Sequence, residues 1–165
     1  MGLLESLPEA LFFFLPTHER TESPMYVCEL TKRTYRSKPQ IEIKGPEDAF
    51  NVLRKRFKHG EAREFFVAIL LSARNTVIGI ETISVGSLNA SIVHPREVYQ
   101  PAVAKSAASL ILAHNHPSGN PEPSDDDLAL TRRLVSVGDL MGIPIVDHLI
   151  VAGGGFLSLK QQGYL

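Results

Sequence analysis

Apolar runs of strand length alternate with amphipathic stretches in this chain after about residue 45. The predicted strands cover 64–71, 76–85, 108–113, 143–151 and 156–159. Arg74-Asn75 predicts the turn of a hairpin between the first two, and the segment 87–93 is either a further short strand or an extended loop. The run 64–71 is continuously apolar after Glu64, which is typical of a strand buried on both faces of a sheet.

Apolar residues at helical spacing predict three helices, one from Pro46 to about His59-Gly60, one over 95–105 and one over 124–141. The second helix places Val98, Ala102 and Val103 on its inner side, and the third carries Leu128, Leu130, Leu134, Val135 and Leu140. The order is therefore helix, hairpin, helix, strand, helix, strand, strand. It predicts an α/β fold in which a mixed β-sheet is flanked by helices around one core.

A basic, polar segment over 31–39 and the pair Gly45-Pro46 mark a change in composition. We therefore expect an N-terminal extension over 1–44 and a compact domain over 45–165. The apolar stretch Leu3 to Leu15 is too short to span a bilayer and lacks the basic start of an export signal. We expect no membrane segment, and the single cysteine, Cys28, fits a cytoplasmic protein without disulfides.

The composition is that of a globular protein, with 44% apolar and 21% charged residues in a chain of 165. A net charge of −1 does not require a nucleic acid or an anionic membrane as partner. The basic residues near Lys55 are expected to form a solvated face. The oligomeric state does not follow from the sequence.

Two imidazoles, a hydroxyl and a carboxylate occur within fourteen residues, as His114, His116, Ser124 and Asp127. Residues at i and i+2 of a strand point to one face, so both imidazoles can share a metal ion. The Pro-rich loop 117–123 can fold the start of the next helix back toward them. His114, His116 and Asp127 then predict a zinc site with three protein ligands and one open position, which is typical of hydrolases.

A purely structural interpretation competes with this one. Ser124 followed by three aspartates is also a good helix N-cap, and His114 and His116 could be ordinary core residues. A capping motif does not require two histidines on one face directly upstream. The combination therefore favours a metal.

Hydrolysis also needs a base that is close to the metal but not bound to it. Glu64 and Glu81 are the candidates, and spacing alone does not choose between them; Glu97 and Glu122 fit less well. Either Asp147-His148 is a pair that orients a metal ligand, or His148 is, as the commoner case, a satisfied core or edge histidine.

The spacing His114-x-His116, seven residues, Ser124-x-x-Asp127 resembles the JAMM metalloprotease signature of MPN domains. The longer string 112–124, with Thr131-Arg132-Arg133, Asp147-His148 and 93–98, is similar to the bacterial RadC branch over about residues 45–165. The resemblance implies a cytidine-deaminase-like α/β fold and Zn²⁺ held by His114, His116 and Asp127. It also implies that Glu64, rather than Glu81, is the catalytic base and that Ser124 stabilises the developing oxyanion.

A zinc metallopeptidase or isopeptidase acting on a protein or peptide is the function that this resemblance implies. Two alternatives stay open, a non-catalytic MPN module that binds a protein partner and a DNA-repair-associated accessory protein. RadC proteins often carry a helix-hairpin-helix DNA-binding region, and residues 1–44 lack its Gly-rich hairpins. DNA is therefore the weaker candidate partner.

Overall fold

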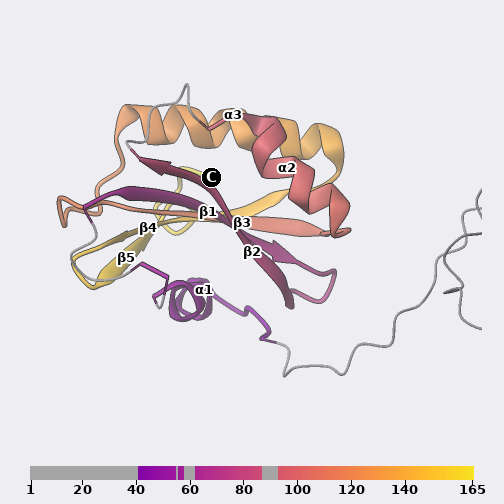
Figure 1. Ribbon diagram of the computed structural model, residues 1–165, viewed down its shortest axis with the longest axis horizontal. Coiled ribbons are helices and arrows are strands. Elements are labelled where there is room, and N and C mark those ends of the chain that lie inside the picture. The colour runs from indigo at the N-terminus through magenta and orange to yellow at the C-terminus, as the bar shows by residue number, and fades with distance from the viewer. Residues whose placement is uncertain (1–40, 55, 58–61, 87–92) are drawn as a thin grey trace, which may run out of the picture. The chain divides into compact units, whose positions relative to one another are not determined.

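A five-stranded mixed sheet forms the centre of the protein in a computed structural model, which describes residues 41–54, 56–57, 62–86 and 93–165 (Figure 1). Its strands lie in the order β2-β1-β3-β4-β5. They are β1 (Glu64–Leu71), β2 (Val77–Gly86), β3 (Ser109–Asn115), β4 (Ile145–Ala152) and β5 (Gly155–Ser158). The helices are α1 (Pro46–Leu53), α2 (Pro95–Ala104) and α3 (Asp125–Met141).

The sheet has one parallel pair, β3 with β4, and α3 makes the crossover between these two strands. All other neighbours are antiparallel, including the hairpin of β1 with β2 and the non-local pair of β1 with β3. This topology brings the start of β1 beside the end of β3. Residues about fifty positions apart in the sequence thereby meet at one end of the two central strands.

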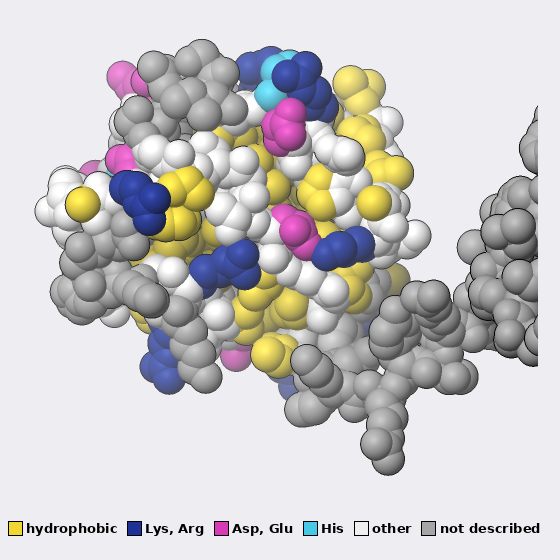
Figure 2. Space-filling model, in the orientation of Figure 1, with side chains coloured by type: hydrophobic (Ala, Val, Ile, Leu, Met, Phe, Trp, Pro, Cys, Tyr) yellow, Lys and Arg dark blue, Asp and Glu magenta, His cyan; other side chains and the backbone are white. Residues whose placement is uncertain are grey.

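Helices cover both faces of the sheet, with α2 and α3 on one face and α1 on the other (Figure 1). Alternate residues of β1 point into two separate cores. Phe66, Ala68 and Leu70 pack on the side of α2 and α3, and Val67, Ile69 and Leu71 pack on the side of α1. Burial on both faces explains why β1 and β3 are continuous apolar runs. Figure 2 shows acidic and basic side chains interspersed on the outer surface of one view.

The first turn of α3 is held by a capping box. The Ser124 hydroxyl accepts a hydrogen bond from the Asp127 backbone N–H, and the Asp127 carboxylate accepts one from the Ser124 N–H. The helix ends at Gly142, whose φ of 67° is the left-handed conformation that glycine adopts without a steric penalty. The position and orientation of Asp127 are therefore fixed by local backbone contacts.

The predicted order of elements and the predicted fold class are confirmed. Three details were wrong. The helix α1 ends at Leu53, several residues before His59-Gly60. Val103 was placed on the inner side of α2, but 54% of it is exposed, and Leu140 at the end of α3 is 88% exposed. Both lie near helix ends, where the apolar stripe continues past the edge of the core.

All the described residues fall within one compact unit, Ser37–Leu165. The predictions for Leu3–Leu15, Cys28 and the basic segment 31–39 fall outside the described residues, as does most of 87–93. A boundary at residue 45 therefore stays a prediction. Among the helices that the structure describes, none combines the length and the apolar character needed to cross a bilayer.

Candidate metal centre

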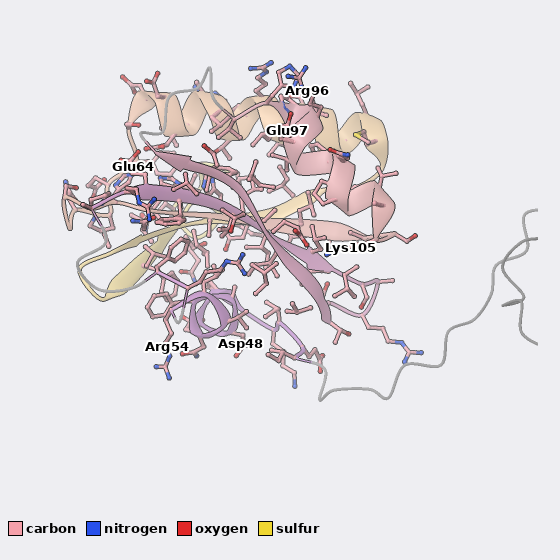
Figure 3. The ribbon with its side chains drawn as sticks, viewed as in Figure 1. Asp48, Arg54, Glu64, Arg96, Glu97 and Lys105 are labelled. Carbon is pink, nitrogen blue, oxygen red and sulfur yellow. The ribbon has the colours of Figure 1, made fainter. Side chains whose placement is uncertain are left out.

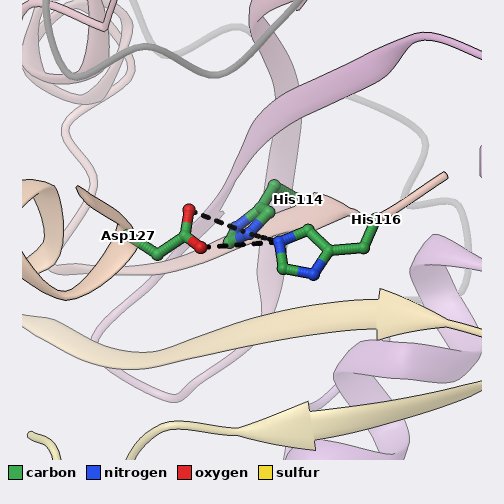
Figure 4. A group of neighbouring side chains, drawn as sticks. All are labelled: His114, His116 and Asp127. Atoms are coloured by element: carbon green, nitrogen blue, oxygen red, sulfur yellow. Dashed lines mark hydrogen bonds and ion pairs between the residues drawn. The ribbon is translucent and has the colours of Figure 1, made fainter. Parts of the chain in front are cut away.

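His114, His116 and Asp127 converge at the C-terminal end of β3 and the N-terminal end of α3 (Figure 4). The Nε2 atoms of the two imidazoles are 3.0 Å apart. Asp127 places Oδ1 3.3 Å from the Nε2 of His114 and Oδ2 3.5 Å from the Nε2 of His116. The ligand-capable atoms of these three residues all lie within 4.8 Å of one another.

These separations fit a metal ion. Four ligands at about 2.0 Å from a tetrahedral zinc ion are about 3.3 Å from one another. The two imidazole nitrogens are 3.0 Å apart, and each lies near one of the two Asp127 oxygens, at 3.3 Å from Oδ1 and 3.5 Å from Oδ2; all three distances are close to that value. Two imidazole nitrogens and one carboxylate suit Zn²⁺ and other borderline divalent ions, so the donor set fits the metal but does not identify it.

Local structure accounts for the approach of the three side chains. His114 and His116 lie two residues apart in extended chain, and the His116 N–H donates to the Val151 carbonyl just beyond the last β3 residue. Pro117 follows and begins the turn toward α3. The side chain of Asn115, on the opposite face, accepts from the Phe65 N–H and donates to the Arg63 carbonyl, which ties the end of β3 to the start of β1.

Burial and charge act in opposite directions within the cluster. Complete burial lowers the pKa of His114 to about 4, so this ring is neutral at physiological pH. The hydrogen bond to Asp127 raises the pKa of His116. Burial would by itself raise the pKa of Asp127, but the contacts with His116, His114 and Ser124 outweigh it and hold that pKa well below its ordinary value.

The tautomer of His116 follows from its other ring nitrogen. Its Nδ1 lies 2.8 Å from the Asn120 carbonyl oxygen, which can only accept, so Nδ1 carries a proton. A neutral His116 therefore presents the lone pair of Nε2 to His114 and Asp127. In the metal-free protein a proton on Nε2 can balance the Asp127 charge, and a metal ion would displace that proton.

Ser124 lies at the helix start, beside Asp127. Its hydroxyl donates to Oδ2 of Asp127 at 2.6 Å, and its backbone N–H donates to the same oxygen at 2.8 Å. Both bonds anchor the carboxylate that faces the two imidazoles. The structure thus brings Ser124 to the cluster through Asp127.

Glu64 lies on the face of β1 that looks toward the cluster. Phe66 pairs with His114 in the antiparallel register, and continuing that register by two residues sets Glu64 opposite His116. The negative charge of Glu64 makes a small contribution to the raised pKa of His116. Figure 3 shows Glu64 at the start of β1, well separated from the labelled Lys105.

Glu81, the other candidate base, is engaged elsewhere. It pairs with Ala68 in the hairpin, well along β1 from the cluster, and its carboxylate forms an ion pair with Lys105, just after α2. Glu97 forms an exposed ion pair with Arg96, and the Glu122 N–H bonds to Asn120 in the loop before α3. Glu64 is the carboxylate among these whose backbone position fits a base at the cluster.

Apart from one contact with the His148 backbone, the side chains of Asp147 and His148 have different partners. Asp147 accepts from the His148 N–H, the Ser158 hydroxyl and the Lys160 N–H, and so secures the C-terminal segment. The ring of His148 instead reaches Nδ1 of His114 and the hydroxyl of Thr131. Thr131 was not predicted as a site residue, although its position four residues after Asp127 places it on the same helix face.

Comparison with known proteins agrees with these features. The family model described as "RadC-like JAB domain" matches residues 43–164. A UPF0758 protein of Caldanaerobacter subterraneus subsp. tengcongensis is 48% identical over 124 residues, which are 75% of this chain and 53% of that protein. UPF0758 proteins of Methanosarcina mazei (42% over 141 residues) and Clostridium acetobutylicum (45% over 139 residues) match 84% and 83% of this chain, and 61% and 60% of their own lengths.

This chain therefore spans between half and two thirds of the length of these relatives, and their shared name states no activity. JAB domains include metallohydrolases, and the cluster of His114, His116 and Asp127 gives this chain a group able to bind a metal. The matched region includes all the described elements from α1 to β5. On the extent of the family match and the identity to these relatives, the chain belongs to the RadC-like JAB domain family.

Proposed function

We propose that this protein is a zinc-dependent hydrolase that cleaves an amide bond in a peptide or isopeptide substrate. The convergence of two imidazole nitrogens and one carboxylate, with Glu64 on the facing strand, is the observation that supports it. His114, His116 and Asp127 would hold the metal. When bound, a divalent cation supplies the Lewis acidity that lowers the pKa of water and polarises a carbonyl group.

Glu64 is the proposed general base and acid. Its carboxylate would take a proton from the attacking water and give it to the amine that leaves when the C–N bond breaks. The register of β1 with β3, continued two residues past Phe66 and His114, would set Glu64 opposite His116, beside the metal ligands and outside the cluster itself. A carboxylate used in this way must be able to exchange its proton within one turnover.

Ser124 is the proposed donor to the developing oxyanion. Rotation about its Cβ–Oγ bond would turn the hydroxyl O–H away from Asp127 Oδ2, so that it donates a hydrogen bond to a substrate oxygen instead. Asp127 would stay in place, because the same oxygen still accepts from the Ser124 backbone N–H at 2.8 Å. The Ser124 hydroxyl can therefore first support Asp127 and then donate to the oxyanion.

A screen of the zinc-loaded protein against peptide and isopeptide libraries tests the proposal. Hydrolysis should vanish after treatment with a chelator and return when zinc is restored. A second chelated sample reloaded with magnesium controls for the handling and should stay inactive, since Mg²⁺ prefers oxygen ligands. A protein that binds zinc but cleaves nothing would contradict the proposal and favour a non-catalytic MPN module.

A further inference from the structure

A row of buried hydrogen bonds leads from the candidate ligand His114 to the backbone of the candidate ligand Asp127. Nδ1 of His114 is 2.8 Å from Nε2 of His148, and Nδ1 of His148 is 2.6 Å from Oγ1 of Thr131. Thr131 is in turn 2.6 Å from the backbone carbonyl oxygen of Asp127, one helical turn earlier. All three side chains are at most 2% exposed.

The direction of each bond in this row can be assigned. A carbonyl oxygen only accepts, so the single hydroxyl proton of Thr131 points to Asp127. Oγ1 of Thr131 must then accept from His148, whose proton therefore lies on Nδ1. His148 is fully buried, and its ring contacts a hydroxyl and another imidazole rather than a carboxylate, so it is neutral.

A neutral imidazole has one N–H, so Nε2 of His148 is an acceptor, and Nδ1 of His114 must donate to it. Nε2 of His114 is then left with its lone pair. That atom lies 3.0 Å from Nε2 of His116 and 3.3 Å from Oδ1 of Asp127. The row thus prepares His114 in the only neutral tautomer that can bind a metal at the cluster.

Packing holds both rings in this arrangement. The Phe66 ring stacks on His114, with centroids 6.1 Å apart and an interplanar angle of 11°. It meets His148 edge-on at 5.5 Å and 75°. A flip of His148 would break two short hydrogen bonds, and a flip of His114 would break the bond to His148, within a fully buried layer, so the orientation is determined before any metal arrives.

We propose that Thr131 and His148 are positioning residues that fix the tautomer of His114 for metal binding. The proposal rests on the metal site of the proposed function. It adds that the helix carrying the ligand Asp127 also sets the protonation pattern of the ligand His114, through Thr131. Partners of this kind behind a metal ligand commonly change metal affinity by 10- to 100-fold when removed.

The test compares Thr131→Val with Thr131→Ser. Valine has nearly the same shape but no hydroxyl, so Nδ1 of His148 loses its acceptor. His148 can then adopt the tautomer with its proton on Nε2, and His114 would in turn carry its proton on Nε2 rather than Nδ1. We expect zinc to bind Thr131→Val about 10-fold or more weakly, measured by competition with a chromophoric chelator. Thr131→Ser should bind like the wild type. Circular dichroism in excess chelator checks that each protein is folded.

A second readout does not depend on metal. Nitrogen-15 NMR of the histidine rings in the metal-free wild type should show the His114 proton on Nδ1, and in Thr131→Val a population with the proton on Nε2. Equal zinc affinity and equal tautomers in both proteins would overturn the proposal. So would a wild type in which His114 carries its proton on Nε2, which decides the matter even where Thr131→Val fails to fold. A wild-type protein that binds no zinc would instead overturn the proposed function. The tautomer measurement would then still test whether Thr131 and His148 fix the tautomer of His114.

Discussion

Phe66 of β1 and His114 of β3 lie opposite each other in an antiparallel pair, and their rings stack on the face covered by α3. This pairing fixes the register between two strands that are far apart in the sequence. Because side chains alternate along a strand, Glu64 shares the face of Phe66 and falls opposite His116. A shift of one residue would turn Glu64 to the other face of the sheet. The proposed base and the candidate ligands therefore depend on one strand register.

Glu64→Gln should abolish hydrolysis and leave zinc binding intact, because the amide keeps the shape of the carboxylate but cannot accept a proton. Loss of a general base lowers turnover by about 10²–10⁴-fold. Glu81→Gln is the matched control, since Glu81 is bound to Lys105 and lies along the hairpin from the cluster. Turnover and zinc content should be measured on the same samples. Activity that survives in Glu64→Gln would remove this residue from the mechanism.

Substitutions of Ser124 should separate its capping role from its proposed role in catalysis. Glycine is tolerated at an N-cap at a cost of a few tenths of a kcal/mol, whereas alanine costs about 1 kcal/mol. Ser124→Gly should therefore stay nearly as stable as the wild type in urea unfolding, yet lose about 10²–10³-fold in turnover with its hydroxyl. Ser124→Thr should retain both properties. Wild-type turnover in Ser124→Gly would show that the hydroxyl serves only the cap.

The sequence was sufficient to predict the elements because each is set by local patterns. The continuous apolar run of β1 and the Ser124 cap of α3 contain their own signals, and both were predicted within a residue of their observed limits. The candidate ligands also follow from spacing, since His114 and His116 are two residues apart at the end of β3 and Asp127 lies in the first turn of the next helix. Residues close together in the sequence were enough to predict these elements and candidate ligands.

Relationships between distant segments were harder to predict. Spacing alone left Glu64 and Glu81 equivalent, because only the non-local pairing of β1 with β3 distinguishes them. The sequence also leaves open whether Asp147 and His148 act as a pair or His148 is a core histidine. Neighbours along a strand face opposite sides of the sheet, and the partners of these two side chains come from other segments of the chain. Leu140 is likewise exposed because the core ends before it, and helical periodicity does not predict where a core ends.

Zinc should stabilise the protein against heat, because a metal that binds only the folded state shifts the unfolding equilibrium. Free zinc at 100 times its dissociation constant contributes about 2.7 kcal/mol. For a folded unit of this size that is a rise in Tm of about 10 °C. The shift should disappear in His116→Ala, whose side chain is only partly buried. An equal shift in that variant would mean that the stabilising zinc binds elsewhere.

Gly138→Ala should destabilise the protein, although alanine is the better helix former by about 1 kcal/mol. A Cβ at this position in α3 would lie 2.5 Å from the Tyr99 hydroxyl and 2.7 Å from the Ile143 carbonyl oxygen. Accommodating such an extra atom in a packed core typically lowers the free energy of unfolding by about 1–3 kcal/mol. Tyr99→Phe removes one of the two clashes, so the double variant should lose less stability than the sum of the losses in the two single variants. Urea midpoints give the comparison, and a gain in stability from Gly138→Ala alone would contradict it.

Tyr99 should make the protein sensitive to alkaline pH. Burial, with a smaller contribution from Asp139, raises the pKa of Tyr99 from 10.0 to about 12, and its hydroxyl donates to the Leu134 carbonyl at 2.8 Å. Between these two values the folded protein keeps a proton that the unfolded chain has lost, so stability falls as the pH rises. The full loss from this group is about 3 kcal/mol and is absent below pH 10.

Tyr99→Phe isolates this effect from the other groups that titrate at high pH. At neutral pH the variant should be less stable by about 1 kcal/mol, because the bond to Leu134 is gone. Its unfolding free energy should then decline less steeply than that of the wild type between pH 10 and 12, so that the two curves approach each other and cross. Parallel curves over that interval would show that the hydroxyl of Tyr99 titrates alike in the folded and unfolded chains.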